Sequence, residues 1–424
     1  LHSLRRRQRQ MLIRDRSYKN ESYFSMETGA RLRKYKDTHT MQISNHTLLK
    51  SSLTFGANAS GKSNLLKAFE LLRSVILNPT SSSVQQIPFS PFVLTNDKSK
   101  GESSFQITLF SSGFVYRYTL VYSARNISYE KLEIEKQDKF EVYFERENQK
   151  FDVPSNLLSY RENIRENATL LFMAQSLNDT HAKNVFKWFA EDLIIVDKES
   201  INTEMFKLLE DDLNKKLFIS FLQAADIQIE DVEIRVEEAN VTNELRTLLQ
   251  QFSGNDIAKN LHIRKLYIIH KTYDENGKAN GLAAIPFNAE SDGTKRIISI
   301  ALTILSRRTE SKVIMIDEFD DSFHLELSQA LLDVFNTKEN INQFILTTHE
   351  LQLMDQHLRK DQINFVEKAY DGSSQLFSLF DFDSESFKRD DISYMKRYLS
   401  GQFGSAPIIS LDGLVDAVSK TSEV

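Results

Sequence analysis

Cysteine is absent from all 424 residues of the chain. Without thiols the protein cannot form disulfides, use a cysteine nucleophile or bind zinc through cysteine, and such a composition is typical of a reducing compartment. Only 13 glycines and 6 prolines are present, which argues against long flexible linkers. No apolar run approaches the length of a membrane span. We therefore expect a cytoplasmic protein with no membrane partner.

A strong charge of either sign is also lacking. The 53 Lys and Arg residues are outnumbered by 59 Asp and Glu residues, for a net charge of −6. This balance gives no global signature of nucleic-acid binding, although a local basic patch is compatible with it. Residues 1–10 are Arg-rich and are expected to be an upstream extension, with Met11 as the natural start. The extension could contact nucleic acid, but a disordered tail is the favoured interpretation.

A phosphate-binding loop is the clearest motif of the chain. Residues 56–63 read GANASGKS, which matches G-x-x-x-x-G-K-S. Its glycines let backbone N–H groups point at a phosphate, Lys62 supplies a positive charge, and the Ser63 hydroxyl can ligate Mg²⁺. Residues 53–55 favour a strand and residues 64–77 have helical spacing, which is the context the motif requires. The predicted nucleotide-binding residues here are Gly56, Asn58, Ala59, Ser60, Gly61, Lys62, Ser63 and Asn64.

An acidic pair follows a second apolar strand. Residues 313–316 form an unbroken apolar run, as expected of a buried parallel strand, and Asp317 and Glu318 come directly after it. Ligands gather at the carboxyl ends of such strands. Asp317 could therefore hold a Mg²⁺ ion already bound through Ser63, and Glu318 could deprotonate an attacking water. Asp320 and Asp321 fit an acidic turn that caps the next helix, predicted over residues 322–336.

Two further features fit the same site. Residues 343–348 form an apolar strand that ends at His349, which could contact the γ-phosphate or the attacking water. Ser291 and Gly293 stand just before an apolar helix at residues 297–305, where they could form a second anion-binding corner. The same pair also reads as an ordinary helix N-cap. Its place just before the acidic strand favours the functional interpretation.

The rest of the chain predicts a meander and a helical insertion. Alternating segments between residues 105 and 145 indicate antiparallel strands. Helical spacing occurs at 156–176, 181–193 and 203–224, and Trp188 lies on an apolar face expected to be core. Strands return at 232–236 and 266–271. A basic loop with Lys34, Lys36 and His39 fits either a solvated surface or a position near the nucleotide. The predicted domains are 1–10, an N-lobe at 11–154, an insertion at 155–255 and a C-lobe at 256–424.

This order of motifs resembles an ABC-type ATPase head of the SMC, RecF and OLD-like branch. More narrowly, GANASGKSNLLKA, ESDGTKR, IDEFDDSFH and FILTTHE are similar to the AAA-15/AAA-21 group of bacterial abortive-infection ATPases, and so is the segment 398–407. The resemblance covers most of residues 11–410. It implies an α/β fold: an ABC-type P-loop ATPase head with an antiparallel β meander and a helical insertion.

The resemblance also implies roles for individual residues, with ATP and Mg²⁺ as cofactors. Lys62 and Ser63 would bind phosphate and Mg²⁺, and Asp317 would support the metal. Glu318 would be the catalytic base and His349 the switch histidine.

A second copy of the chain is implied as well. Ser291 and Gly293 would reach the γ-phosphate of ATP held by the opposite protomer, which implies a homodimer or higher oligomer around two ATP molecules. The signature reads Ser-Asp-Gly where Ser-Gly-Gly is usual. Gln85 and Gln86 are the candidates for the Q-loop glutamine, and either could be plain loop. His324 is expected to face the dimer interface.

The number of residues after the acidic strand bears on whether a nuclease domain could follow the ATPase in this chain. OLD nucleases carry a Toprim nuclease domain there, whereas residues 319–424 are too few for one and contain no matching acidic cluster. We therefore expect an anti-phage ATPase that controls a separate nuclease or toxin. The alternatives are a RecF-like DNA-repair ATPase and a nucleotide-gated scaffold with little turnover. The phosphate loop does not distinguish ATP from GTP.

Overall fold

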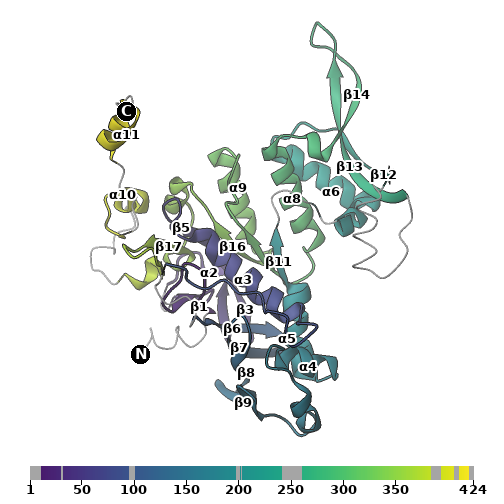
Figure 1. The fold of residues 1–424 in the computed structure, drawn as a ribbon. Helices are drawn as coiled ribbons and strands as arrows, with labels where there is room; N and C mark the ends of the chain where they lie inside the picture. The colour runs from purple at the N-terminus through teal and green to yellow at the C-terminus, as the bar shows by residue number, and fades with distance from the viewer. Residues whose placement is uncertain are drawn as a thin grey trace, which may run out of the picture. The chain divides into compact units, whose positions relative to one another are not determined.

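The computed structural model describes residues 11–29, 32–94, 101–196, 201, 203–240, 260–382, 393–404 and 410–419. The chain divides into two compact units, one made of residues 1–195 and 312–424 and the other of residues 196–311 (Figure 1). The extension at 1–10 and residues 405–407 of the resemblance lie outside the described part, and the domain boundaries given above stay a prediction. None of the helices in the described residues combines the length and hydropathy that crossing a membrane requires.

A six-stranded sheet carries the predicted motifs of the first unit. Its order is β11-β15-β16-β5-β17-β18, and β15, β16, β5 and β17 run parallel. Because these strands are parallel, the residues that follow β5, β15 and β16 meet at one edge of the sheet. The strands are β5 (Ser51–Phe55), β11 (Leu193–Val196), β15 (Val313–Ile316), β16 (Gln343–Thr347), β17 (Ile363–Lys368) and β18 (Ser374–Ser378).

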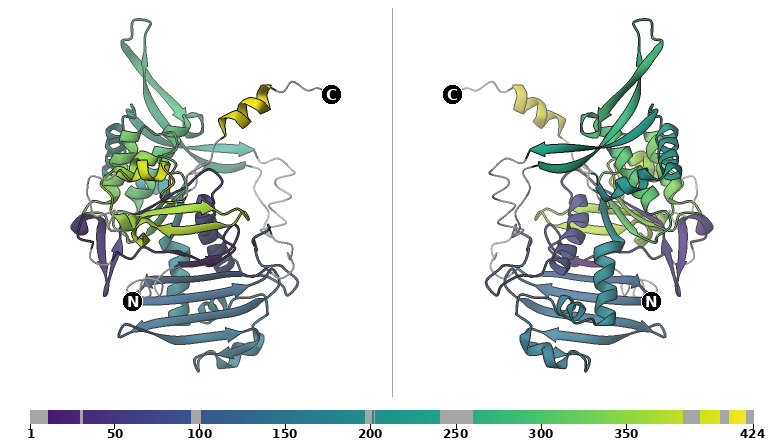
Figure 2. Two further views of the ribbon diagram at one scale, coloured as in Figure 1. Left: turned by 90° about the vertical axis from the view of Figure 1, so that its left-hand side faces the viewer. Right: turned by 90° about the vertical axis from the view of Figure 1, so that its right-hand side faces the viewer.

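A seven-stranded antiparallel sheet confirms the predicted meander. Its order is β10-β9-β8-β7-β6-β1-β2, and Figure 2 shows strands β6 to β9 side by side. Burial alternates along β6, as the alternating sequence predicts. The strands are β1 (Met11–Arg14), β2 (Ser22–Phe24), β6 (Ser103–Ser111), β7 (Phe114–Tyr122), β8 (Ile127–Lys136), β9 (Lys139–Glu147) and β10 (Lys150–Asp152).

Helix α3 (Lys62–Leu77) lies at the centre of this unit. Its buried face, which includes Leu65 and Phe69, shares one hydrophobic core with Phe105 of the seven-stranded sheet and Met315 of the six-stranded sheet. The helix therefore fixes the phosphate loop, at its N-terminus, between the two sheets.

The helix predicted over 156–176 begins later than its periodicity indicates, whereas the helix predicted over 181–193 starts within one residue of its expected position. In place of one helix over 156–176, a 3₁₀ turn (Leu158–Asn163) is followed by α4 (Leu170–Ser176), because the Thr169 side chain caps the later start. Helix α5 (Thr180–Lys187) is capped by Asp179 and passes through a π-helical turn into β11. Trp188 is buried in the core, as predicted.

The second unit combines helices with a three-stranded antiparallel sheet. The predicted helix over 203–224 is divided, because Asp211 caps a new helix. Strands β12 and β13 are longer than predicted, since each extends along its hairpin partner. The elements are a 3₁₀ helix (Thr203–Glu210), α6 (Asp212–Ala224), β12 (Asp231–Asn240), β13 (Asn260–Tyr273), β14 (Ala279–Pro286) and α8 (Asp292–Ser306).

Smaller elements complete the first unit. The basic loop lies in part on α2, where buried His39 pairs with Gln362 at 2.9 Å, while Lys34 and Lys36 are exposed. These lysines therefore fit the solvated-surface interpretation. The remaining elements are α2 (Lys36–His39), β3 (Thr40–Ile43), β4 (His46–Leu49), α9 (Leu325–Phe335), α10 (Tyr394–Leu399) and α11 (Leu411–Ser419), with short 3₁₀ turns at Leu351–Asp355, Lys360–Gln362 and Leu379–Asp381.

Candidate nucleotide-binding site

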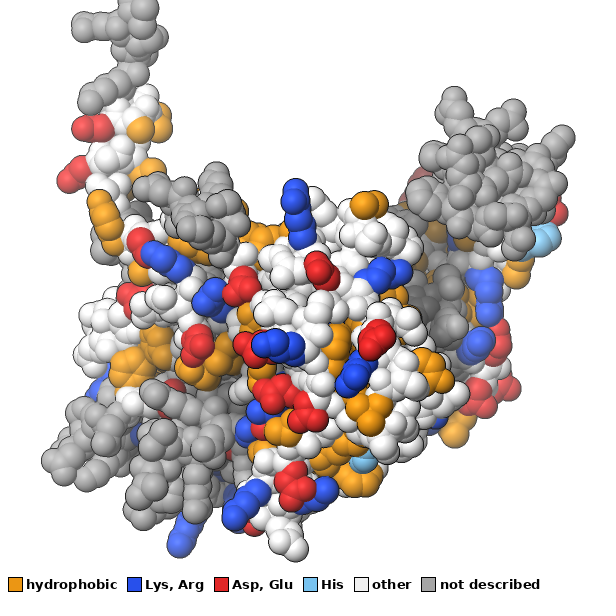
Figure 3. Space-filling model, turned by 60° about the horizontal axis from the view of Figure 1, so that its bottom comes forward, with side chains coloured by type: hydrophobic (Ala, Val, Ile, Leu, Met, Phe, Trp, Pro, Cys, Tyr) orange, Lys and Arg blue, Asp and Glu red, His pale blue; other side chains and the backbone are white. Residues whose placement is uncertain are grey.

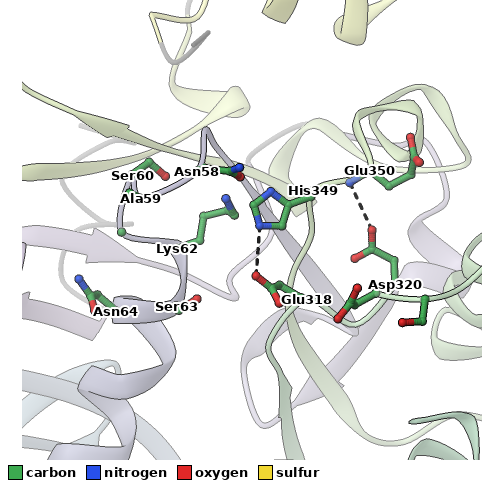
Figure 4. A pocket seen from close by; sticks show the side chains of 13 residues that line it. Asn58, Ala59, Ser60, Lys62, Ser63, Asn64, Glu318, Asp320, His349 and Glu350 are labelled. Carbon is green, nitrogen blue, oxygen red and sulfur yellow. Dashed lines mark hydrogen bonds and ion pairs between the residues drawn. The ribbon is translucent and has the colours of Figure 1, made fainter. Parts of the chain in front are cut away.

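One cavity of about 990 Å³ opens at the edge where β5, β15 and β16 end. It brings together the phosphate loop, the acidic turn and His349, which Figure 4 shows facing one another. Seven of the eight predicted loop residues line it, as do the predicted Glu318 and His349. The other lining residues, which the sequence did not assign to the site, are Asp320, Asp321, Ser322 and Glu350. The lining residues are Asn58, Ala59, Ser60, Gly61, Lys62, Ser63, Asn64, Glu318, Asp320, Asp321, Ser322, His349 and Glu350.

The two motif glycines are required by the packing of the loop. Gly61 has φ +114°, and a Cβ there would lie 2.2 Å from Oγ of Ser374. A Cβ on Gly56 would lie 2.4 Å from the carbonyl oxygen of Val366. Only glycine fits these positions, so the backbone is free to curl around a phosphate. The loop therefore fits the group that its sequence predicts.

Lys62 is held inside the loop. Its ammonium donates to the carbonyl oxygens of Gly56 at 2.7 Å and Ala57 at 3.1 Å. Burial lowers the pKa of Lys62, while the nearby carboxylates of Glu318 and Asp317 act in the opposite direction. A buried cation whose hydrogen bonds go to neutral carbonyls is suited to a phosphate ligand, because an anion would stabilise its charge more fully.

Ser63 and Asp317 meet from two different elements. The Ser63 hydroxyl donates to Oδ1 of Asp317 at 3.1 Å, although 254 positions separate the two residues. Hydroxyl and carboxylate oxygens are the ligands that Mg²⁺ prefers. These two residues are therefore the ones that could hold the metal predicted from the sequence.

Glu318 faces His349. Its Oε1 lies 3.2 Å from Nε2 of His349 (Figure 4). Glu318 has φ +47°, a left-handed conformation that costs a non-glycine residue on the order of 1–2 kcal/mol. Such strain is often found where function fixes a side chain. The conformation turns Glu318 toward the cavity that it lines.

The capping role considered for Asp320 is wrong. Helix α9 starts at Leu325, three residues later than predicted, and its N-cap is His324, whose side chain makes no capping bond. Asp320 instead accepts hydrogen bonds from the Thr348 hydroxyl at 2.8 Å and the Glu350 amide at 3.2 Å. The turn resists helix because Ser322 has φ +68°. Exposed His324 does not line the cavity.

Residues that are distant in the sequence form a clamp on the phosphate loop, because they are hydrogen-bonded to its backbone and to Asn64. The Tyr18 hydroxyl donates to the carbonyl of Gly61 at 3.0 Å, and Oγ of Ser374 donates to the carbonyl of Ser60 at 2.5 Å. Asn64 donates through Nδ2 to Oγ of Ser17 at 2.8 Å. Sequence reasoning missed this clamp because Ser17, Tyr18 and Ser374 belong to no motif, and only the fold brings them to the loop.

The signature residues belong to the second unit. Oγ of Ser291 accepts from the amide of Thr294 at 3.2 Å, so Ser291 caps α8, and Gly293 follows in its first turn. The ordinary N-cap interpretation therefore holds for a single chain, and the cross-protomer role stays a prediction. Neither Gln85 nor Gln86 lines the cavity; Gln85 instead accepts hydrogen bonds from Ser81 in a local turn.

The fold and the site together define an ABC-type P-loop ATPase head. A parallel sheet carries the phosphate loop, the acidic strand and the histidine strand on adjacent strands, with an antiparallel sheet on the other side of α3. Residues 55–355 match the family described as "AAA domain, putative AbiEii toxin, Type IV TA system", and the chain belongs to this family. The predicted fold class and family resemblance are confirmed.

The solved structures described below share little sequence identity with this chain. No curated protein is significantly similar in sequence. Among solved structures, the SMC head domain from Thermotoga maritima shares 11% identity at a TM-score of 0.38, over 87% of this chain and 98% of that one. An SMC head bound to the C-winged helix domain of ScpA shares 11% at 0.40, over 87% and 97%. A Pyrococcus furiosus Smc head, with an extended coiled coil and bound to the C-terminal domain of ScpA, shares 10% at 0.37, over 87% and 95%.

Proposed function

We propose that this protein binds and hydrolyses ATP with Mg²⁺, and that two copies dimerise around ATP to control a separate nuclease or toxin in a bacterial anti-phage system. The observation that carries the proposal is the pair of contacts, Ser63 with Asp317 and Glu318 with His349, beside the phosphate loop. Membership of a family whose description names a toxin of a toxin–antitoxin system supports the defence role.

The phosphate loop, the acidic pair and His349 have distinct roles in the proposed reaction. Lys62 and the loop amides bind the β- and γ-phosphates. Ser63 and Asp317 hold Mg²⁺, which neutralises charge on the phosphates when it is bound. Glu318 accepts the proton of the attacking water, and His349, 3.2 Å away, orients the carboxylate. The products are ADP and inorganic phosphate.

A single substitution tests the assignment of the base. Glu318→Gln keeps the shape of the side chain but removes its basicity, so it should bind ATP normally and hydrolyse it about 100-fold or more slowly in single-turnover assays. Glu326→Gln, at an exposed position of α9, is the matched control. Hydrolysis by Glu318→Gln at the wild-type rate would show that Glu318 is not the base. Wild-type protein that binds ATP without turning it over would favour the nucleotide-gated scaffold.

The dimer is tested through the second unit. ATP should convert Glu318→Gln from monomer to dimer in sedimentation velocity, because slow turnover keeps the nucleotide in place. Adding Ser291→Arg should block this dimer by placing a bulky cation where the γ-phosphate would be capped, while binding of ATP to one protomer is retained. Glu275→Arg, an exposed charge reversal in the same unit, is the control. Unchanged dimerisation in the Ser291→Arg protein would remove the cross-protomer role.

The output partner is proposed to be a protein. On the face drawn in Figure 3, Lys and Arg side chains are interspersed with Asp and Glu, and the net charge is −6. Such a surface suits protein contacts better than the phosphate backbone of nucleic acid. Affinity purification of the native complex, followed by mass spectrometry and nucleic-acid analysis, tests this. Bound DNA with no effector protein would support the RecF-like alternative.

A further inference from the structure

We propose that Asp320 is a positioning residue that holds the segment 348–350, so that His349 stays against Glu318. The inference rests on the proposed function, because it assigns a role within that site. Asp320 is an additional carboxylate of the site, and its side-chain hydrogen bonds described here go to neither the phosphate loop nor the predicted metal ligands.

The hydrogen bonds of Asp320 bracket His349. Oδ2 of Asp320 accepts from the Thr348 hydroxyl at 2.8 Å and from the Glu350 amide at 3.2 Å, the latter drawn in Figure 4. The Glu350 amide also lies 2.9 Å from Oγ1 of Thr348. One carboxylate oxygen therefore fixes the residue before and the residue after the histidine.

His349 needs such support because its own surroundings hold it loosely. Its side chain is 42% exposed, and the contact described for its imidazole is the one with Glu318. Strand β16 ends at Thr347 and the next 3₁₀ turn starts at Leu351, so residues 348–350 lie between two regular elements. The position of the imidazole then depends on its backbone, and a shift of about 1 Å in such a group can lower a rate about 100-fold.

Asp320 and Glu318 lie on the same turn. Asp320 stands two residues after Glu318, and the Glu318 amide donates to Oγ1 of Thr347 at 2.7 Å. The acidic turn and the end of β16 are thus joined on both sides of the Glu318–His349 contact. Oδ1 of Asp320 is buried and has no hydrogen-bond partner among the described residues, which is a cost that this positioning role would explain.

Kinetics of Asp320 variants test the inference. Asp320→Ala should lower kcat about 10- to 100-fold while the Kd for ATP changes less than about 3-fold, because the binding groups stay in place. Asp320→Asn keeps an acceptor oxygen and should recover most of the lost rate. Glu326→Ala, at an exposed position of α9, is the control. If Asp320→Ala does not fold, Thr348→Val removes one of the two bonds and takes its place.

A double-mutant cycle separates positioning from general stability. In a His349→Ala background, Asp320→Ala should have little further effect on kcat, since the group that it positions is gone. An equal loss in both backgrounds, or a loss in Kd instead of kcat, would overturn the inference. Because Glu318→Gln is scored in the same assay, normal hydrolysis by that variant would reject the proposed function itself, whereas additive Asp320 and His349 effects beside a slow Glu318→Gln would reject this inference alone.

Discussion

Oγ1 of Thr347 lies 2.5 Å from Oδ1 of Asp317, on the neighbouring strand end. The same oxygen accepts the amide of Glu318 at 2.7 Å, so the hydroxyl donates to one member of the acidic pair and accepts from the other. Asp317 also accepts from Ser63 at 3.1 Å. The orientation of both acidic residues is therefore set partly by β16, which carries no acidic residue itself.

Replacing this hydroxyl should reduce turnover. Thr347→Val keeps the shape of a fully buried side chain but removes both hydrogen bonds. Hydrogen bonds to charged groups contribute about 1.5–3 kcal/mol, so we expect kcat to fall about 10- to 100-fold with a smaller change in ATP affinity. Thr347→Ser retains the hydroxyl and is the control. A kcat for Thr347→Val equal to that of wild type would mean that β16 does not orient the acidic pair.

Lys62 should be essential for nucleotide binding. Its buried ammonium is bonded to loop carbonyls, within the loop where the phosphates are proposed to bind. Lys62→Ala should weaken ATP binding at least about 100-fold in isothermal titration calorimetry, because the positive charge that pairs with the β- and γ-phosphates is lost. Lys67→Ala, exposed on the same helix, should bind as wild type does. Tight binding by Lys62→Ala would place the phosphates elsewhere.

The loop geometry makes a prediction about glycine. Gly61→Ala introduces a Cβ 2.2 Å from Oγ of Ser374 at a φ of +114°, so the loop must shift away from its clamp. We expect ATP binding to be lost while the thermal unfolding temperature falls only modestly. Gly113→Ala is the matched control, because Gly113 also has positive φ (+85°) but an added Cβ there would have no atom within 4 Å. Equal ATP affinity of the two variants would show that the loop tolerates a side chain.

The elements around the motifs could be predicted because their signals are local. The apolar run at β15 matches the predicted strand, and α3 begins only two residues before the predicted helix. Each of these signals lies within about 20 consecutive residues. The parallel order of β15, β16 and β5 then follows from the expected fold.

Long-range contacts could not be predicted from the sequence, and some helix starts were predicted wrongly. Contacts such as Ser374 with Ser60 join residues 314 positions apart and depend on the whole fold. Two helix starts had a local signal, since Thr169 and Asp211 are good N-cap residues, but the apolar spacing continues across both positions and predicts longer helices. An acidic residue before a helix is usually a cap, and this pattern predicts a capping role for Asp320. Its carboxylate instead accepts a hydrogen bond from Thr348, just after β16.

Asp15 should make the stability of the fold depend on pH. Its side chain is buried, accepts a hydrogen bond from Ser103 at 2.7 Å and lies 3.5 Å from the Arg16 guanidinium. Burial raises the pKa of Asp15 from 3.8 to about 6, against the lowering effects of Ser103 and Arg16. The charged form is therefore less favourable in the folded protein than in the unfolded chain.

The sign of the effect follows from proton binding. Between pH 4 and pH 6 the folded protein binds more protons at Asp15 than the unfolded chain, so this contribution is fully present below about pH 4 and is lost as pH rises through about 6. The total is about 3 kcal/mol for a pKa difference of about two units. Asp15→Asn cannot titrate, so the free energy of unfolding of wild type minus that of the variant should fall by this amount from pH 4 to pH 7 in urea titrations. Asp138→Asn, on an exposed turn, is the control. A difference that stays constant across this range would show that the carboxyl is charged in the folded protein at every pH tested.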